Sequence, residues 1–342
     1  MKRKSEREIM SATRPEDIFT MQLDVIEQEK NEYIERFKPT EYRAIQNFVV
    51  SRQIMLFYEE AISRINNGLS LNEFTICAKN GREYKIHYNN SFPFKLGQMY
   101  ITGKYVIYVI DGKYQKYYRN YITKTNSYLK PDMKIWEFAQ YMVPNVEINF
   151  ETIEGNFCIF IKKPCEKMYS IREILEYFNG SLKPEYVASI LTRLYYFACY
   201  MSLVETTHNG ITIDNLFFAP GRRTEDGESY TVEDMRILGV YGGWFFTTYF
   251  NEKIQAVPKE VYEILPFQCK DRGYSSFEVD ELSIKKVAKE LLGNQTNIPL
   301  PMQEWVNKTT ISKDPKTEYH AWEEVRRKSF GGRRFVDMDV SI

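Results

Sequence analysis

The spacing of apolar residues changes twice along this chain, and that change constrains the fold more than any other feature. Residues 14–66 carry apolar side chains at helical spacing, whereas the period falls to two from residue 72. After Pro164 the spacing is helical again, with a long apolar stripe from Pro184 to about Thr206. This order predicts an α+β chain in which a small strand-rich part lies between helical segments.

Turn signals divide the strand-rich part into hairpins. The dipeptide Asn80-Gly81 separates EFTICA from EYKIHY and favours a type I′ turn. We expect a second hairpin where residues 111–113 separate YVIYVI from YQKYYRNYI. A short helix, PDMKIWEFAQYM, and two further strands, VEINFET and NFCIFIKK, would complete a mostly antiparallel sheet with one helix.

Composition excludes several classes of protein. The 342 residues include 46 Lys and Arg against 46 Asp and Glu, so neither a basic histone-like body nor an acidic disordered tail fits. A hydrophobic fraction of 43% argues against wholesale disorder. No apolar run approaches the roughly 18 residues that a membrane span needs, so we expect a soluble protein that does not enter a membrane.

The cysteines and histidines argue against disulfides and metal sites. The five cysteines are scattered, odd in number and never arranged as CxxC, which indicates reduced thiols in a cytoplasm. With only three histidines in the chain, we expect no structural zinc site.

Two segments after the long helix resemble motifs of the protein kinase family. The run HNGITIDNL is similar to the family's catalytic loop, with His208 and Asn215 at the required spacing. Further on, ILGVYGG stands where the family has a strand followed by its metal-binding Asp-Phe-Gly triplet. The resemblance puts Val240, Tyr241 and Gly242 in that triplet.

Flanking segments extend the resemblance. IFIKKPCEKMYSIREIL looks like the family's fifth strand, hinge and following helix. AVPKEVYEIL is similar to the Pro-Glu motif that closes the activation segment, with Pro258 and Glu260 as the matches. VDELSIKKVAKELLG resembles the central helix of the large lobe, and this implies that Asp280 anchors the backbone of the catalytic loop. The order and spacing of the motifs carry the resemblance, which covers roughly residues 72–330.

The resemblance implies a two-lobe protein kinase-like fold, with a small antiparallel β lobe and a helical lobe. We expect a helical N-terminal extension suited to docking or oligomerisation, a β-rich lobe, a helical large lobe and a flexible tail. These four parts span residues 1–68, 69–163, 164–330 and 331–342.

The chemistry of the family is not supported by the matching residues. Phosphoryl transfer needs one carboxylate to orient the acceptor hydroxyl and another to hold magnesium. Gly210 and Val240 stand at these positions, and neither side chain accepts a proton or binds Mg²⁺. Asp214 is the nearest carboxylate. It either substitutes for the missing group or forms a turn in a solvated loop.

The nucleotide-binding residues of the family are also poorly matched, since the chain has no GxGxxG loop. The best candidates for the family's lysine and glutamate pair are Lys116 in YQKYYRN and Glu137 in KIWEFAQ. The alternative is that both are surface residues of a strand and a helix. We therefore expect no bound metal and no cofactor, with ATP and Mg²⁺ as the alternative.

These observations predict a catalytically inactive kinase-like scaffold or protein-binding module whose partner is another protein. One alternative is an atypical phosphotransferase that binds ATP and uses shifted residues such as Asp214, Asn215 or Glu137. Another is a structural component of a viral (phage) assembly, which would place the protein in a host cytoplasm or a virion. Basic runs at residues 2–4 and 326–334 have no accompanying stacking platform, so we expect no sequence-specific binding of nucleic acid.

Overall fold

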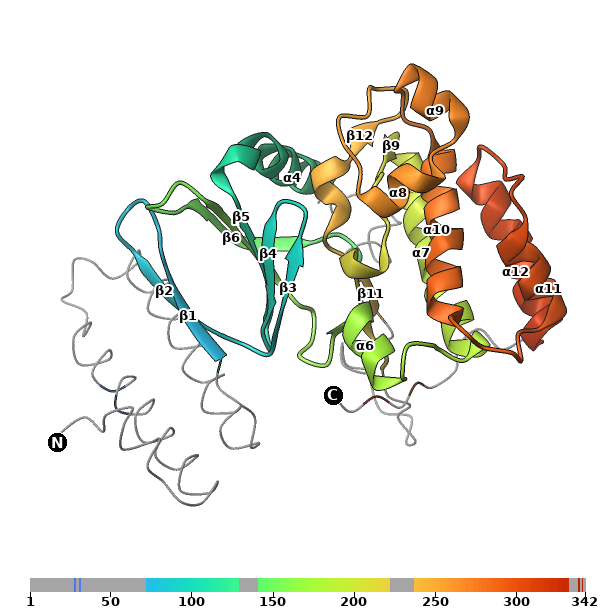
Figure 1. Ribbon diagram of the computed structural model, residues 1–342, viewed down its shortest axis with the longest axis horizontal. Helices are drawn as coiled ribbons and strands as arrows, with labels where there is room; N and C mark the ends of the chain where they lie inside the picture. Colours follow the sequence, from blue (N-terminus) through green and yellow to red (C-terminus); the bar gives the residue numbers. More distant parts are fainter. Residues whose placement is uncertain are drawn as a thin grey trace, which may run out of the picture. The chain divides into compact units, whose positions relative to one another are not determined.

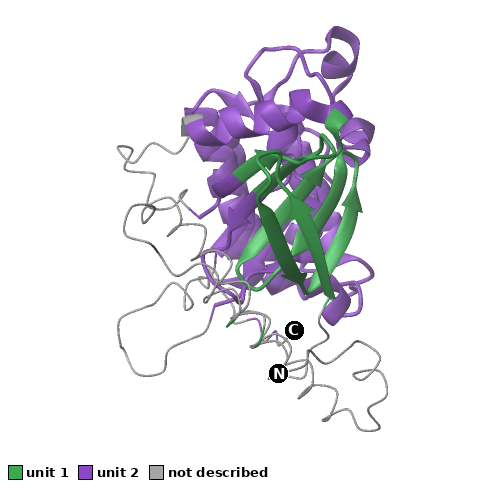
Figure 2. Ribbon diagram, turned by 90° about the vertical axis from the view of Figure 1, so that its left-hand side faces the viewer, with its two compact units in different colours: residues 1–112, 149–159 green, residues 113–148, 160–342 purple. Residues whose placement is uncertain are grey.

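The computed structural model describes most of the chain from residue 72 onward. The described residues are 28, 31, 72–128, 141–221, 237–331, 338 and 340. They fall into two compact units, coloured separately in Figure 2: one contains residues up to 112 with 149–159, and the other contains 113–148 with 160–342. The expected helical extension over 1–68 and most of the expected tail lie outside the described residues.

The first hairpin forms at the expected place, but its turn is not of the expected type I′, because Gly81 takes a positive φ and Asn80 does not. Strands β1 (Asn72–Cys77) and β2 (Glu83–Tyr88) pair in an antiparallel two-stranded sheet. Gly81 takes a positive φ of 81° in the turn, which glycine adopts without steric cost. The Asn80 side chain accepts a hydrogen bond from the Arg82 N–H at 3.1 Å and closes the turn.

A five-stranded sheet follows along the chain (Figure 1). Its spatial order is β3-β4-β5-β7-β6. The strands are β3 (Asn90–Phe94), β4 (Gly97–Ile101), β5 (Tyr105–Ile110), β6 (Asn145–Glu151) and β7 (Phe157–Lys162). The inner strands β5 and β7 are buried along nearly their whole length, as expected for strands covered on both faces.

The prediction of a second hairpin is wrong. After β5 the chain forms a short 3₁₀ turn and then helix α4 (Gln115–Tyr128), where YQKYYRNYI was predicted to be a strand. Tyr117, Tyr121 and Lys124 recur at helical spacing, and their face of α4 packs against residues 241–249 of the same unit. The helix expected over PDMKIWEFAQYM lies almost entirely outside the described residues.

Helix α7 (Pro184–Leu203) is the centre of the helical unit and matches the predicted apolar stripe. It begins with proline in its first turn and packs against α10 (Phe277–Leu292) and α12 (Pro315–Phe330). Helix α11 (Leu300–Asn307) packs on α10 and α12. Helix α6 (Ile171–Tyr177) begins with a capping box formed by Ser170 and Glu173.

Two small sheets fix the segments between these helices. Strand β10 (Leu216–Ala219) lies between β8 (Tyr169–Ser170) and β11 (Ile237–Val240), and β9 (Thr206–Thr207) pairs with β12 (Thr248–Tyr249). The segments that begin at residues 208 and 241 are therefore held at both ends.

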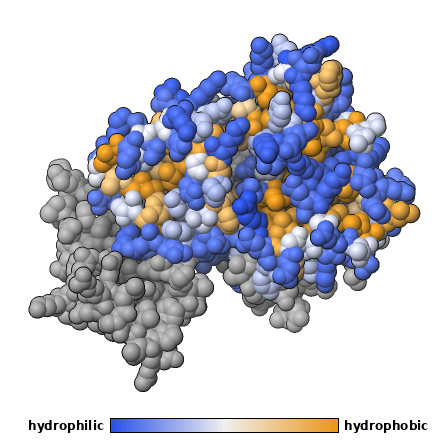
Figure 3. Space-filling model, viewed as in Figure 1, coloured by the Kyte–Doolittle hydropathy of each residue, from blue (hydrophilic) through white to orange (hydrophobic). Residues whose placement is uncertain are grey.

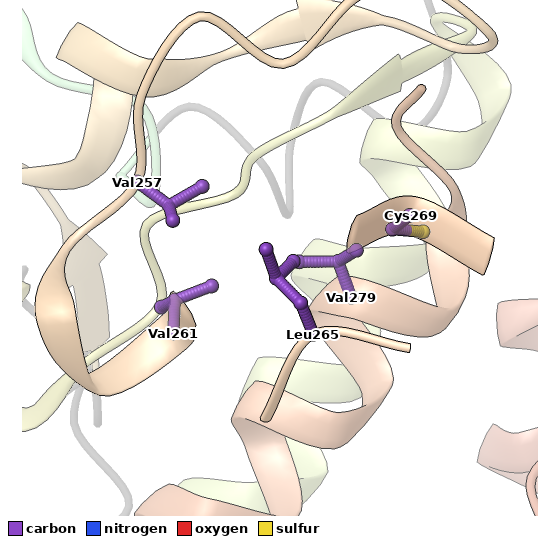
Figure 4. Close-up of a cluster of buried hydrophobic side chains, with 5 residues drawn as sticks. All are labelled: Val257, Val261, Leu265, Cys269 and Val279. Carbon is purple, nitrogen blue, oxygen red and sulfur yellow. The ribbon is translucent and has the colours of Figure 1, made fainter. Parts of the chain in front are cut away.

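Helices α8 (Lys259–Ile264) and α9 (Phe267–Arg272) are fixed by a small apolar cluster (Figure 4). Its members come from both helices, from the segments beside them and from α10. They are Val257, Val261, Leu265, Cys269 and Val279.

The order of elements confirms the prediction of an α+β kinase-like fold, in which a small antiparallel β-rich part precedes a helical part. Among the described helices, none combines the length and the apolar character that crossing a membrane requires.

Candidate functional site

The backbone of the loop after β9 is hydrogen-bonded to the carboxyl group of Asp280. Asp280, on α10, accepts hydrogen bonds from the backbone N–H groups of His208 at 2.7 Å and of Asn209 at 2.8 Å. Asp280 is buried, and burial raises its pKa to about 7 although the two N–H donors act in the opposite direction. The carboxyl group therefore serves to position the loop backbone.

His208 is enclosed by aromatic rings. Its side chain is fully buried, with edge-on contacts to Phe197 at 5.2 Å and to Trp244 at 5.4 Å between ring centroids. Burial lowers the pKa of the imidazole to about 3, so the ring is neutral at pH 7. Neither ring nitrogen has a hydrogen-bond partner among the described residues. A general base needs access to its substrate, and this histidine has none.

Asn209 was not singled out from the sequence, yet it shapes the loop. Its backbone takes a positive φ of 57°, which asparagine tolerates better than most residues. Its side-chain amide donates to the Phe246 carbonyl at 3.2 Å and to the Thr248 hydroxyl at 2.9 Å. Asn209 therefore joins the loop to the segment that follows β11.

Gly210 has no room for a side chain. A Cβ atom built on it would lie 2.6 Å from the Cα and 2.9 Å from the carbonyl oxygen of Gly243, closer than real Cβ contacts come. Gly243 has no room for a side chain either, because a Cβ on it would overlap His208 and the Gly210 carbonyl. The position at which the resemblance calls for an aspartate is thus closed by backbone.

Asn215 also takes part in the contact between the loop and the segment after β11. Its side-chain amide donates to the Gly210 carbonyl at 2.8 Å, and its backbone carbonyl accepts from the Tyr241 N–H at 3.0 Å. A Cβ on Gly242 would overlap the Asn215 side-chain oxygen. Three glycines, at 210, 242 and 243, therefore allow the loop and the segment after β11 to lie directly against each other.

Val240 and Tyr241 are part of the core. Both side chains are buried, and Tyr241 stacks on Phe217 with ring centroids 5.3 Å apart. The Tyr241 hydroxyl donates to the Tyr141 carbonyl at 3.3 Å, and burial raises the pKa of that hydroxyl. Neither side chain is a carboxylate that could hold Mg²⁺, and the described residues contain no cluster of three or more His, Cys, Asp or Glu that could hold a metal ion.

Helix α4 fastens the segment after β11. The Asn120 amide lies 3.4, 3.2 and 3.1 Å from the carbonyl oxygens of Trp244, Phe245 and Thr247. The Tyr121 hydroxyl donates to the Tyr241 carbonyl at 2.6 Å. These contacts could not be found from the sequence, because the predicted strand gave these side chains a different arrangement.

Lys124 continues the same face of α4. Its amine lies 3.1 Å from the centroid of the Tyr249 ring, a cation–π contact that replaces part of its lost hydration. Burial of the side chain lowers the pKa of the amine. Three successive turns of α4, at Tyr117, Tyr121 and Lys124, thus contact residues 241–249.

Asp214 lies away from this contact. Its carboxylate accepts hydrogen bonds from the Nε and Nη2 atoms of Arg172, on α6, and the two side chains are 44% and 37% exposed. Both hydrogen bonds go to the Oδ1 atom, so the guanidinium holds the Asp214 side chain toward α6. Of the predicted loop residues, His208, Gly210 and Asn215 come together, and Asp214 does not join them.

The predicted nucleotide-binding pair is not assembled by the described residues. Lys116 lies exposed in the first turn of α4, and Glu137 lies outside the described residues. In chain order, the third strand of the five-stranded sheet is β5, with the sequence YVIYVI. The strand from which the resemblance draws a lysine therefore contains no charged residue.

Pro258 and Glu260 stand apart from the loop contacts. Pro258 is buried and precedes the first residue of α8, and Glu260 is exposed in the first turn of that helix. A carboxylate at the positive end of a helix is favourable, which accounts for Glu260 without a further partner.

Comparison with known proteins gives a likeness of shape. No protein-family model matches the chain, and no curated protein matches its sequence. Among solved structures it is similar to vaccinia related kinase 3, at 13% identity over 75% of this chain and 77% of that one, with a TM-score of 0.46. The Mycobacterium tuberculosis PknI kinase domain matches at 11% identity over 70% and 95% of the two chains, with a TM-score of 0.45. The BubR1 kinase domain matches at 11% identity over 75% and 84%, with a TM-score of 0.48. Such identities and scores say nothing about activity, substrate or partner.

Proposed function

We propose that this kinase-like chain is catalytically inactive and that it acts by binding another protein. The observation that carries the proposal is the contact between Gly210 and the backbone of Gly243. The space that a side chain would need at this position is filled by backbone, so a substrate hydroxyl has no carboxylate to meet there.

The other polar groups at the loop, from the loop itself and from α10, already have structural roles. Asp280 binds two backbone N–H groups, and His208 is neutral and enclosed. Both residues support the loop from within. Their arrangement keeps the architecture of a catalytic loop and removes its chemistry.

The atypical phosphotransferase has less support. That reading relies on Asp214, whose carboxylate is paired with Arg172, and on Asn215, whose amide binds the Gly210 carbonyl. An enzyme built on these residues would have to break both contacts before binding Mg²⁺. The role in a viral assembly stays a prediction.

A binding role is supported by exposed aromatic side chains in the segment that runs from β12 to the start of α10. Large apolar side chains that remain exposed in a folded chain are common in protein interfaces. Among the described residues of this segment they are Tyr249, Phe250, Tyr262, Phe267 and Tyr274.

Nucleotide binding and phosphoryl transfer test the inactivity. The full chain would be heated with millimolar ATP and Mg²⁺ or Mn²⁺, beside an active protein kinase domain as the positive control. A ligand at 100 times its Kd stabilises a folded protein by about 2.7 kcal/mol, a rise of roughly 2–4 °C at this size. We expect no metal-dependent rise and no transfer of labelled phosphate to a general substrate. Transfer that is lost in the Asp214→Asn variant would contradict the proposal.

A further inference from the structure

Helix α4 presents two different faces. One face, with Tyr117, Asn120, Tyr121 and Lys124, contacts residues 241–249. The opposite face is exposed and includes Lys116, Arg119, Thr123 and Asn126. The surface over α4 is mostly hydrophilic in Figure 3.

The exposed face of α4 carries one sign of charge. From Gly112 to Pro131 the sequence contains five Lys or Arg residues and no Asp or Glu, although the whole chain has equal numbers of both signs. Lys116 and Arg119 make no ion pair with any described residue. They lie three positions apart on α4, one turn from Lys113 in the preceding 3₁₀ turn.

Helix stability does not account for this charge. The first turn of a helix favours acidic side chains, because the N-terminal end of the helix dipole is positive. Helix α4 has no acidic residue in its first turn and carries Lys116 there instead. Pairs of opposite charge one turn apart would stabilise the exposed face, and α4 has none. The cations therefore lower the stability of the helix slightly, which fits a surface shaped by a ligand.

We propose that Lys113, Lys116 and Arg119 bind an acidic segment of a partner protein. The proposal rests on the binding role given above and names the chemistry of the partner. The three residues span about 9 Å along the helix axis, at about 1.5 Å per residue. An extended peptide covers that distance in about three residues, at about 3.3 Å each. The stripe therefore fits carboxylates spaced two or three residues apart.

An acidic peptide fits this face better than a nucleic acid does. Nucleic acids are held by a broad basic surface that neutralises many phosphates, usually with exposed aromatic rings on which bases stack. The stripe has three cations, and the chain as a whole has a formal charge of zero. A short row of carboxylates needs no more than the stripe provides.

Fluorescence anisotropy with a defined probe tests the proposal. The probe is a fluorescein-labelled decapeptide of alternating Glu and Ala, and a peptide with Gln in place of Glu is its control. We expect the full chain to bind the Glu peptide at low salt and to lose that binding at 0.5 M salt. The Lys116→Glu, Arg119→Glu double variant should bind at least tenfold more weakly. The Lys116→Gln, Arg119→Gln variant gives the same comparison without added repulsion.

A matched control separates the stripe from net charge. Lys313 and Lys316 are exposed, lie three positions apart at the start of α12 and have no ion pair among the described residues. The Lys313→Glu, Lys316→Glu variant makes the same change in net charge, and we expect it to bind within twofold of the original chain. Thermal unfolding midpoints of all variants should agree within a few degrees.

Three results would overturn the proposal. They are no binding of the Glu peptide, an equal loss in the Lys313 and Lys316 variant, and tighter binding of a 20-nucleotide single-stranded RNA that is lost in the Lys116 and Arg119 variant. The inactivity is judged separately, because it depends on phosphate transfer. Transfer would contradict inactivity and leave a positive peptide result standing, and a failed peptide assay would leave inactivity standing.

Discussion

Gly210 and Gly243 touch through their backbones, and a Cβ atom on Gly210 would lie 2.6 Å from the Gly243 Cα. Close approach of two backbones is a use of glycine that no other residue can replace. The contact seals the loop at the position where the kinase-like resemblance requires a carboxylate.

Replacing Gly210 by Asp should therefore destabilise the protein and fail to create activity. We expect a loss of about 3 kcal/mol or more in the free energy of unfolding, from overpacking and from a buried charge. Urea unfolding measures it. Gly155 has a positive φ but open space around it, so Gly155→Asp should cost only about 1 kcal/mol. Equal losses in the two variants would show that the Gly243 contact is unimportant.

Asp280→Ala should destabilise the loop by about 2–4 kcal/mol, because it leaves two buried N–H groups without an acceptor. Asp280→Asn keeps one acceptor oxygen and should cost less. Chemical denaturation compares both with Asp271→Ala, a change at an exposed residue of α9 that should have little effect. A cost for Asp280→Ala no larger than that of the control would argue against the anchoring role.

His208 alone should lower the stability of the folded protein as the pH falls. Burial lowers the pKa of His208 to about 3, so the folded state binds the proton less tightly than the unfolded chain, whose histidines have a pKa near 6.5. The contribution of His208 is complete above about pH 6.5 and is lost as the pH falls toward 3, by up to about 1.4 kcal/mol per pH unit.

Asp280 acts in the opposite direction, since a pKa raised from 3.8 to about 7 removes stability as the pH rises through that window. The His208→Phe variant separates the two effects. Between pH 6.5 and 5 the two effects oppose each other with similar slopes, so the urea midpoint of the original chain should change little, whereas the midpoint of the variant should rise as the pH falls. Identical slopes for the two proteins would rule out a contribution from His208.

Asn120→Ala should loosen residues 244–247 by removing the amide that faces three of their carbonyl oxygens. We expect a loss of about 1–3 kcal/mol and faster amide exchange in residues 241–249. Hydrogen exchange read by mass spectrometry locates the change. Asn126→Ala, on the exposed face of α4, is the matched control and should leave exchange unaltered. Unchanged exchange in Asn120→Ala would mean that α4 does not hold this segment.

Local signals in the sequence predicted the elements that local interactions specify. The turn at Asn80-Gly81 lies between β1 and β2 as expected, because the dipeptide itself favours a tight turn. Helix α7 follows from its apolar stripe and from Pro184 in its first turn. Both predictions depended on residues that are neighbours in the chain.

The segment that forms α4 was predicted to be a strand because tyrosine favours strands, although its tyrosines at 114, 117, 118 and 121 recur at helical spacing. The partners of this helix, residues 241–249, lie far along the chain and could not be identified from the local pattern. The closure at Gly210 could not be predicted for the same reason. A glycine in a motif reveals a missing side chain, but only the fold reveals that another backbone occupies its place.

The Asn120 amide meets the carbonyl oxygens of Trp244, Phe245 and Thr247. These residues follow Asn120 in the chain by 124, 125 and 127 positions. Bringing such distant parts together costs loop-closure entropy before any contact is made. The β1–β2 hairpin, in contrast, closes over a connection of five residues, and hairpins form in roughly 1–10 μs. We therefore expect α4 to reach its final environment late in folding. On the ribosome, it would emerge and wait without its covering segment until residues 241–249 have been synthesised.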